Sequence, residues 1–240
     1  HQVTLFEAAS TPGGHTATVD IATPQGTWAI DTGFIVYNDR TYPHFIGLLS
    51  ELGIRGQKTQ MSFSVHNPQS GLEYNGHSLS SLFAQRRNLL KPAFWGLLRE
   101  IVRFNRLAKQ ALGGAFDPAA TLQTFLERHR FSPFFARHYI LPMGAAIWSS
   151  SLQEMRRFPL ALFLRFFDNH GLLDIRQRPQ WYVVPGGSRE YVRALLVRSG
   201  DRLSLRLNTP VQNVIRGQDG VTLQLATGEE HFDQAIFACH

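Results

Sequence analysis

An acidic residue at the end of a short apolar run is the first feature with a chemical meaning. Glu7 directly follows Val3–Phe6, whose apolar and β-branched residues indicate a strand. In dinucleotide-binding folds, an acidic residue at a strand end accepts hydrogen bonds from ribose hydroxyls. It normally follows a G-x-G-x-x-G turn by about 20 residues, whereas only six residues precede Glu7 here. Glu7 is therefore a candidate ribose ligand, and the alternative is a surface carboxylate at a strand end.

Two glycines and a histidine follow this strand in a turn-rich loop. Gly13 and Gly14 have no Cβ, so their backbone can pass close to a phosphate or a flavin. His15 can donate a hydrogen bond to a pyrophosphate. The alternative for His15 is a turn histidine that faces solvent. The loop is thus a candidate for contact with an anionic cofactor.

The remaining residue patterns disfavour several other chemistries. The ten histidines show no H-x-x-x-H or H-E-x-x-H spacing, so no metal site is predicted. The chain has neither a G-x-S-x-G elbow nor a P-loop. The single cysteine, Cys239, excludes an intramolecular disulfide. It ends an apolar run, where we expect buried packing and not a nucleophile.

Charge is concentrated in one segment of the chain. The formal net charge is +6, and much of the excess lies between Arg86 and Lys109. Such a segment suits a dinucleotide, a phospholipid surface or nucleic acid, and the alternative is the solvated faces of helices. No nucleic-acid module is recognisable, so no nucleic-acid partner is expected. Peripheral contact with an anionic membrane is a hypothesis for this segment.

Composition indicates an ordinary globular protein, with 43% hydrophobic and 18% charged residues. No apolar run approaches the roughly 20 residues of a membrane-spanning helix. The chain enters a strand almost at once after His1, without a signal segment. We therefore expect a cytoplasmic protein and a fragment of a longer chain.

Hydrophobic spacing predicts strands at both ends of the chain and helices in the middle. Helices are predicted at 43–52, 79–88, 92–112, 159–169 and 188–198, with two more starting at Asp117-Pro118 and Ser132-Pro133. Strands are predicted at 3–6, 19–21, 28–30, 62–66, 72–74, 181–184, 203–207, 211–216, 221–225 and 235–238. The order predicts a mixed α/β (α+β) fold, in which a helical layer with an antiparallel sheet interrupts a partial Rossmann-like layer.

Five segments in a characteristic order give the chain a family resemblance. It resembles the flavin-containing amine oxidases, whose relatives include protoporphyrinogen oxidase and phytoene desaturase. The GGHT variant is similar to a bacterial subgroup of predicted NAD/FAD-binding proteins. The segments that carry the resemblance are VTLFEAASTPGGHTAT, DTGFIVYN, PMGAAIWSS, WYVVPGGSREYVRAL and DQAIFAC.

The resemblance implies FAD as cofactor and assigns residues to it. Glu7 would hold the adenosine ribose, and Gly13, Gly14 and His15 would line the pyrophosphate and ribityl path. Many relatives carry Arg where His15 stands, so this chain lacks a permanent charge there. The remaining assignments are Gly33 and Phe34 beside the isoalloxazine ring and Val214 beside the adenine.

The resemblance also implies a discontinuous domain organisation. Residues 1–40 and 186–240 would belong to an FAD-binding domain, and 41–185 to a largely helical substrate domain. Pro185-Gly186-Gly187 would mark the return to the flavin layer. From the residues alone, Gly33 is equally a turn glycine, and Ser188 an ordinary cap for the helix that follows.

Four residues are candidates for contact with a small or lipid-like substrate: Tyr37, Asn38, Trp148 and Trp181. Helix core is the favoured interpretation of Met143–Trp148. The aromatic residues at 181 and 182 also suit a plain strand. No catalytic acid or base is predicted, because the cofactor would carry the redox chemistry.

The resulting hypothesis is an FAD-dependent oxidoreductase that transfers a hydride from an organic substrate to the flavin. Two alternatives stay open. The chain is a truncated, non-catalytic body without a complete cofactor site, or it is a Rossmann-like enzyme that uses another adenosine cofactor.

Overall fold

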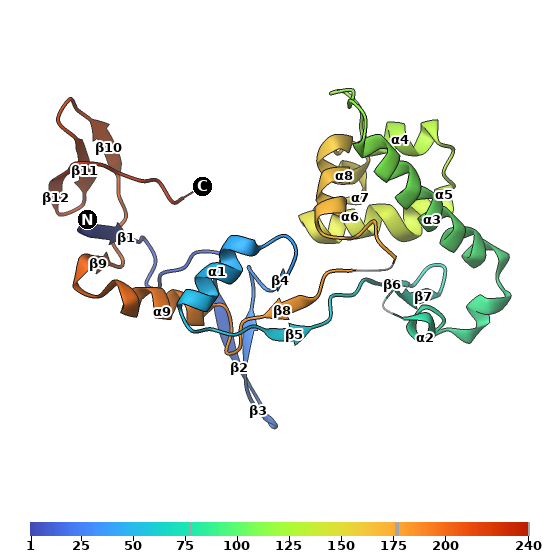
Figure 1. The fold of residues 1–240 in the computed structure, drawn as a ribbon, viewed down its shortest axis with the longest axis horizontal. Helices are drawn as coiled ribbons and strands as arrows, with labels where there is room; N and C mark the ends of the chain where they lie inside the picture. The colour runs from blue at the N-terminus through green and yellow to red at the C-terminus, as the bar shows by residue number, and fades with distance from the viewer. Residues whose placement is uncertain (77, 176–177, 240) are drawn as a thin grey trace. The chain divides into compact units, whose positions relative to one another are not determined.

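The chain folds into two compact units. The computed structural model describes residues 1–76, 78–175 and 178–239, drawn in Figure 1. Unit 1 comprises His1–Tyr37, Pro43–Lys58 and Tyr182–His240, and unit 2 comprises Asn38–Tyr42 and Thr59–Trp181. Unit 1 thus contains residues from both ends of the sequence, with 43–58 in addition.

Unit 1 is built from short sheets and two helices. β1 pairs with β9 in parallel, and β2 pairs with β3 as an antiparallel hairpin. β10, β11 and β12 form an antiparallel meander. The elements are β1 (Val3–Phe6), β2 (Thr18–Thr23), β3 (Gly26–Asp31), α1 (Pro43–Glu51), α9 (Arg189–Ser199), η3 (Gly200–Arg202), β9 (Leu203–Arg206), β10 (Asn213–Arg216), β11 (Val221–Leu225) and β12 (Gly228–Phe232). A further sheet is formed by the segments in which the chain passes from one unit to the other. It has the order β4-β8-β5, with β4 (Tyr37–Asn38), β8 (Trp181–Val183) and β5 (Gln57–Thr59).

Unit 2 is mainly helical and carries one antiparallel hairpin, β6–β7. Its elements are β6 (Ser64–Asn67), β7 (Leu72–Asn75), α2 (Leu79–Leu82), η1 (Arg86–Leu90), α3 (Pro92–Leu112), α4 (Leu122–Arg128), α5 (Pro133–Phe135), η2 (Ala136–Ile140), α6 (Leu141–Trp148), α7 (Leu152–Arg156) and α8 (Leu160–Asn169). Within the described part of the chain, no helix is both long and apolar enough to cross a membrane.

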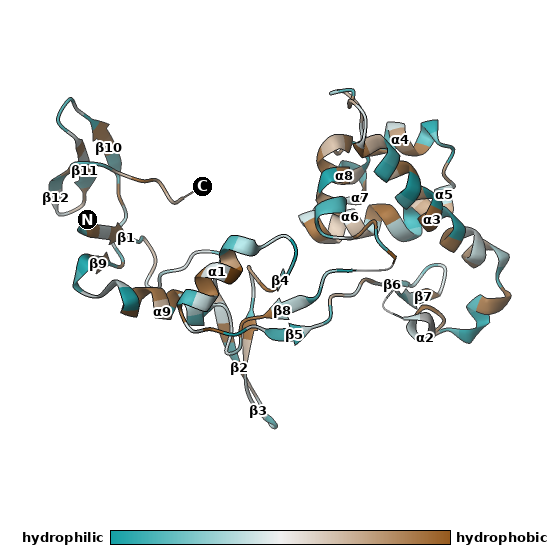
Figure 2. Cartoon of the chain, in the orientation of Figure 1, coloured by the Kyte–Doolittle hydropathy of each residue, from teal (hydrophilic) through white to brown (hydrophobic). Residues whose placement is uncertain are grey.

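The long helix α3 shows how sequence spacing builds the core of unit 2. Phe94, Leu97, Phe104 and Ala108 recur at helical spacing and are all buried. Phe104 meets three aromatic rings, those of Phe125, Phe131 and Phe135, each at a centroid distance of 5.7 Å. Figure 2 shows hydrophobic and hydrophilic residues alternating along α3. One face of α3 therefore anchors the core, and the opposite face stays in solvent.

Most predicted elements are confirmed where local signals are strong. The hairpin around Pro24-Gln25-Gly26 forms as β2–β3, and the predicted 92–112 helix matches α3. Ser132 accepts a hydrogen bond from the amide of Phe135 and so caps α5, as its place before Pro133 predicts. The terminal meander also forms. The mixed α/β fold class is therefore confirmed.

The predicted helix over 79–88 is wrong beyond its first turn. The chain forms the short α2 and then the 3₁₀ helix η1. The Gln85 side chain accepts from the amide of Glu73, and the buried Asn88 donates to the carbonyl of Glu73. Side chains of this segment thus bond to the edge of β7, and that pairing replaces a continued helix.

The helix predicted to start at Asp117-Pro118 begins later. Asp117 accepts from the amide of Ala119 in a turn. α4 starts at Leu122, where Thr121 and Thr124 form a reciprocal capping box. A stronger cap four residues on, at Thr121, therefore sets the boundary.

The strand predicted at 235–238 is also wrong. These residues have no regular secondary structure and no ladder partner in the described chain, and Ile236 and Phe237 are 92% and 69% exposed. Cys239 is exposed and not buried, contrary to the expected packing role. The third meander strand is β12 instead, because Gly228–Phe232 pairs with β11 across a short turn.

Replacing Phe104 by alanine tests the core of unit 2. Phe104 is fully buried, so Phe104→Ala should lower the free energy of unfolding by about 3–5 kcal/mol. Val102, on the exposed face of α3, provides the matched control: Val102→Ala should change it by less than about 0.5 kcal/mol. Urea denaturation followed by circular dichroism measures both. Equal effects would contradict the assignment of the two faces.

Candidate cofactor site

The glycine loop before β2 and the segment after β3 run side by side. The amide of Phe34 donates to the carbonyl of His15 at 3.0 Å. The amide of Thr32 donates to the carbonyl of Ala17 at 2.9 Å. A Cβ added at Gly33 would lie 2.1 Å from the carbonyl oxygen of His15. Only glycine permits this approach, so the structure brings together two segments that the sequence assigns separately to a flavin.

The glycine loop itself is a left-handed turn. Gly13 and Gly14 have φ angles of +127° and +54°, which side-chain-bearing residues rarely adopt. The amide of Thr16 closes the turn by donating to the carbonyl of Gly13 at 2.8 Å. A Cβ added at Gly14 would meet nothing within 4 Å, and Gly14 and His15 are both exposed. The loop therefore presents open backbone that an anion can approach.

The carboxylate of Asp31 ties this hairpin to the start of α9. It accepts from the amide and the hydroxyl of Ser188, both at 2.8 Å, and from the Thr18 hydroxyl at 2.6 Å. The Thr18 hydroxyl in turn accepts from the amide of Arg189 at 3.1 Å. Ser188 precedes α9, but its side chain does not cap the helix as expected, and its hydroxyl donates a hydrogen bond to Asp31.

Gly187 makes this junction possible. Its φ is +92°, and an added Cβ would lie 2.3 Å from the Cγ2 of Thr18 and 3.1 Å from the Asp31 carboxylate. The Pro185-Gly186-Gly187 turn therefore packs directly against the β2–β3 hairpin. The positive φ and the close side chains of Thr18 and Asp31 together account for glycine at this position.

A second junction joins the same loops to both helices of unit 1. The hydroxyls of Thr16 and Tyr191 lie 2.6 Å apart. The ring of Phe34 meets that of Phe45 in α1 at 5.2 Å, and Phe45 meets Tyr191 in α9 at 5.2 Å, both edge to face. The predicted flavin segment is thus held by a polar and an aromatic contact.

Glu7 ends β1 with part of its hydrogen-bonding capacity used locally. Its Oε1 accepts from the amide of Ala9 at 2.8 Å, and its backbone bonds to Arg206 and Thr209. The side chain is half-buried. Glu7 thus lies at the end of a strand in a parallel pair.

Val214 lies in β10, in a different sheet from Glu7. Its amide donates to the side chain of Asn213 at 2.9 Å, and its partner across the ladder is Leu223. The meander contacts β1 through Phe6 and Phe232, whose rings meet edge to face at 5.8 Å. The meander is therefore packed beside the strand that ends in Glu7.

Tyr37 and Asn38 are both buried. Tyr37 stacks on Tyr182 at 5.6 Å, and burial raises the pKa of its hydroxyl. The Oδ1 of Asn38 accepts from the amides of Arg40 and Thr41, each at 2.9 Å. Asn38 Nδ2 has no hydrogen-bond partner within the described residues. In this structure the two side chains shape the backbone and are not open to solvent.

Trp148 and Trp181 are linked through two further rings of unit 2. Trp148 packs at 4.7 Å from Phe166, which stacks on His170 at 3.9 Å. His170 lies parallel to Trp181 at 6.3 Å, and Tyr42 meets its edge at 6.4 Å. Met143–Trp148 belongs to the core helix α6, as favoured from the sequence.

Sequence reasoning missed Asp31, Tyr191 and His170. The acidic residue directly before Thr32-Gly33 was a usable signal for Asp31, because a carboxylate at a strand end often bonds to nearby amides. His170 follows Phe166 by one helical turn, and its Nδ1 lies 2.9 Å from the Phe166 carbonyl. No local pattern pointed to Tyr191.

A family comparison agrees with this arrangement. The model of the family "flavin containing amine oxidoreductase" matches residues 1–240. The chain therefore belongs to the flavin-containing amine oxidoreductases, as the sequence resemblance predicted. A search of curated proteins finds no match to the chain.

Solved structures share the fold at low sequence identity. Putrescine oxidase bound to putrescine is 17% identical, with a TM-score of 0.59, and 94% of this chain covers 50% of that one. Cyclohexylamine oxidase from Brevibacterium oxydans is 19% identical, with a TM-score of 0.63 and the same coverage. An oxidoreductase from Methanosarcina mazei is 12% identical with a TM-score of 0.58, covering 97% and 52%. The chain spans about half the length of these structures.

Gly33 is the position where a small substitution should disturb the site most. Gly33→Ala forces the His15 carbonyl away and should cost about 1–3 kcal/mol of stability. Gly47 in α1 has nothing within 4 Å of an added Cβ, so Gly47→Ala should stabilise by about 0.5–1 kcal/mol. Thermal unfolding distinguishes the two signs. Stabilisation by both would show that the loops do not meet as described.

Removing the Asp31 carboxylate should loosen the start of α9. Asp31→Ala leaves the amide and hydroxyl of the buried Ser188 without their acceptor, at a cost of about 2–4 kcal/mol. Asp31→Asn keeps one acceptor oxygen and should cost less. Asp201→Ala, at an exposed carboxylate in η3, is the control and should change stability by under about 0.5 kcal/mol. Chemical denaturation measures all three.

Proposed function

We propose that this chain is part of an FAD-dependent, amine-oxidase-like oxidoreductase. The family model of the flavin-containing amine oxidoreductases matches residues 1–240, and this membership supports a flavin cofactor. The observation that carries the proposal is the open Gly14–His15 backbone held directly beside Gly33. In this proposal unit 1 binds the cofactor and unit 2 faces the substrate.

The residues of unit 1 fit such a cofactor. Gly14 and His15 are exposed, so the pyrophosphate can approach their backbone. Glu7 keeps a carboxylate oxygen beyond its bond to Ala9 for a ribose hydroxyl. Gly33 and Phe34 would lie beside the flavin ring, and Val214 would lie beside the adenine. FAD, when bound, supplies the acceptor for the hydride.

The protein's own contribution is to orient the cofactor and the substrate. Asp31 fixes the β2–β3 hairpin against α9, and the Thr16–Tyr191 contact fixes the glycine loop. Such preorganisation lowers the entropy cost of holding the reacting groups in place. The residues 1–40 and 186–240 would form the cofactor domain, together with α1.

The proposed substrate is a small organic amine. Two solved structures of the same fold are a putrescine oxidase and a cyclohexylamine oxidase. In unit 2, Trp181 is half-buried beside His170. Aromatic faces attract ammonium groups, and Trp181 and Trp148 are the two substrate candidates that are half-buried and not fully buried.

Cofactor titration of the full chain tests the proposal. FAD, NAD and S-adenosylmethionine are titrated separately by calorimetry, with FAD also followed by quenching of its fluorescence. Saturable binding is expected for FAD, with weaker or no binding of the other two. Glu7→Gln should weaken FAD binding by about tenfold, since one charge-assisted hydrogen bond is worth about 1.5 kcal/mol. The control Asp219→Asn, on the β10–β11 turn, should leave it unchanged.

Each alternative has its own outcome in this experiment. Tighter binding of NAD or S-adenosylmethionine would replace the flavin proposal by a Rossmann-like enzyme with that cofactor. FAD binding without anaerobic loss of the flavin's visible absorbance on addition of putrescine or cyclohexylamine would favour a binding body without amine oxidation. Loss of that absorbance, restored by air, supports the oxidoreductase.

A further inference from the structure

The outward face of α3 carries apolar and basic side chains at helical spacing. Trp95, Arg99, Val102 and Arg106 follow one another at intervals of three or four residues, and all four are exposed. Trp95 is 51% and Val102 53% exposed. These positions lie opposite the buried face of α3, so the core does not require their residue types.

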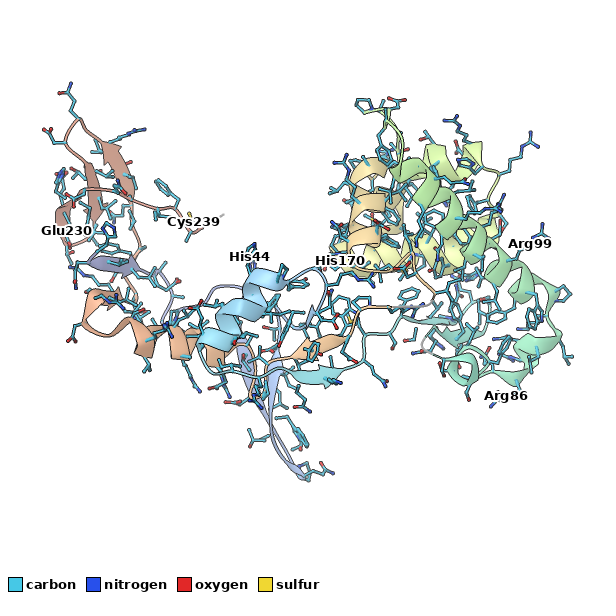
Figure 3. The ribbon with its side chains drawn as sticks, in the orientation of Figure 1. His44, Arg86, Arg99, His170, Glu230 and Cys239 are labelled. Carbon is cyan, nitrogen blue, oxygen red and sulfur yellow. The ribbon has the colours of Figure 1, made fainter. Side chains whose placement is uncertain are left out.

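The segment before α3 extends this face. Leu89 and Leu90 at the end of η1 are 45% and 86% exposed. The indole nitrogen of Trp95 donates to the carbonyl of Leu89 at 2.9 Å, which holds the turn against the helix. Figure 3 shows Arg86 and Arg99 projecting outward from η1 and α3. We call the combined surface the α3 strip: Arg86, Leu89, Leu90, Lys91, Trp95, Arg99, Val102 and Arg106.

The positive charge of the α3 strip is not neutralised within the described part of the chain. From Arg86 to Leu112 the only acidic residue is Glu100. Glu100 accepts from the amide and hydroxyl of Ser132 and from Arg103, so it is committed to the interior. The four cations of the strip form no ion pair among the described residues: Arg86, Lys91, Arg99 and Arg106.

Three other basic residues of the same segment do bond to groups within the chain. Arg87 donates to the carbonyl of Gly71, and Lys109 bonds to Asp174. Arg103 donates to the carbonyl of His129 and lies over the ring of Phe131. Three basic residues of the segment therefore bond to other groups of the chain, whereas in the strip Arg86, Arg99 and Arg106 are exposed and Lys91 is half-buried.

We propose that the α3 strip docks on an anionic lipid surface. Cations near such a surface gain Coulomb energy from its negative potential. Exposed Trp and Leu side chains among the cations gain by entering the headgroup and acyl boundary. Long basic side chains keep their charge at the headgroups while their stems stay apolar. Nucleic acid would use the cations but would leave Leu90 and Val102 without a favourable environment.

Vesicle sedimentation with the full chain tests this proposal. Binding is compared for vesicles of phosphatidylcholine alone and of phosphatidylcholine with one quarter phosphatidylglycerol, at low and high salt. Binding to the anionic vesicles alone, weakened by salt, is expected. The double variant Arg99→Glu/Arg106→Glu should weaken it by at least about tenfold, given about 1 kcal/mol per basic residue at such a surface.

Matched variants outside the strip control for total charge and stickiness. Arg202→Glu/Arg216→Glu changes the same charge at exposed positions of unit 1 and should keep most of the binding. Leu90→Ser should weaken binding by about fivefold, the loss of about one interfacial leucine. Val197 is 82% exposed in α9, so Val197→Ser is its control and should have no effect. Because these side chains are exposed, unchanged thermal unfolding is expected for all variants.

Several results would overturn the lipid assignment. Equal binding to neutral vesicles, no binding to either kind, or equal losses for the strip and control variants would each do so. The same would follow if a duplex oligonucleotide bound in a manner lost in Arg99→Glu/Arg106→Glu while vesicles did not bind. The strip would then be a nucleic-acid surface.

Discussion

The Asp31 carboxylate joins segments that are 157 residues apart in the sequence, because it accepts hydrogen bonds from Ser188 and Thr18 together. The position of α9 against the β2–β3 hairpin depends on this contact. Gly33 lies two residues beyond Asp31, so the same contact sets where the exit of β3 meets the glycine loop. An unpaired carboxylate there would be costly to bury, whereas a fully bonded one fixes a single geometry.

Sequence patterns predicted the elements whose signals are local. α3 has matching apolar spacing and a proline at its start, and the β2–β3 hairpin has alternation and a turn. The failures share one physical cause. The 79–88 segment does not continue as a helix, because Gln85 and Asn88 form hydrogen bonds with β7. Residues 235–238 have no neighbouring strand to pair with among the described residues. Both outcomes depend on tertiary partners that propensity does not contain.

The candidate site shows the same division. Residue types at Gly13, Gly14 and Gly33 predicted that the backbone passes close to a phosphate or a flavin. In the structure Gly13 and Gly14 have positive φ angles, and a Cβ added at Gly33 would lie 2.1 Å from the carbonyl oxygen of His15. That Gly33 approaches His15 itself was not predictable, since loop closure over such a distance depends on the whole hairpin. The burial of Asn38 was not predictable either. It depends on the hydrogen bonds that the Asn38 side chain accepts from the amides of Arg40 and Thr41, which the residue type alone does not indicate.

The two faces of α3 are under different constraints. Phe104 and its neighbours must be apolar and of fitting size, since the core closes around them. Folding places no such demand on the outward face, where hydrophilic residues of either charge would serve equally well. A face that nonetheless combines tryptophan, valine and two arginines, with no acidic residue, differs from the mixed charges of an ordinary solvated helix. The fold does not require the residue types there, whereas the proposed contact with an anionic lipid surface would use both the cations and the apolar side chains.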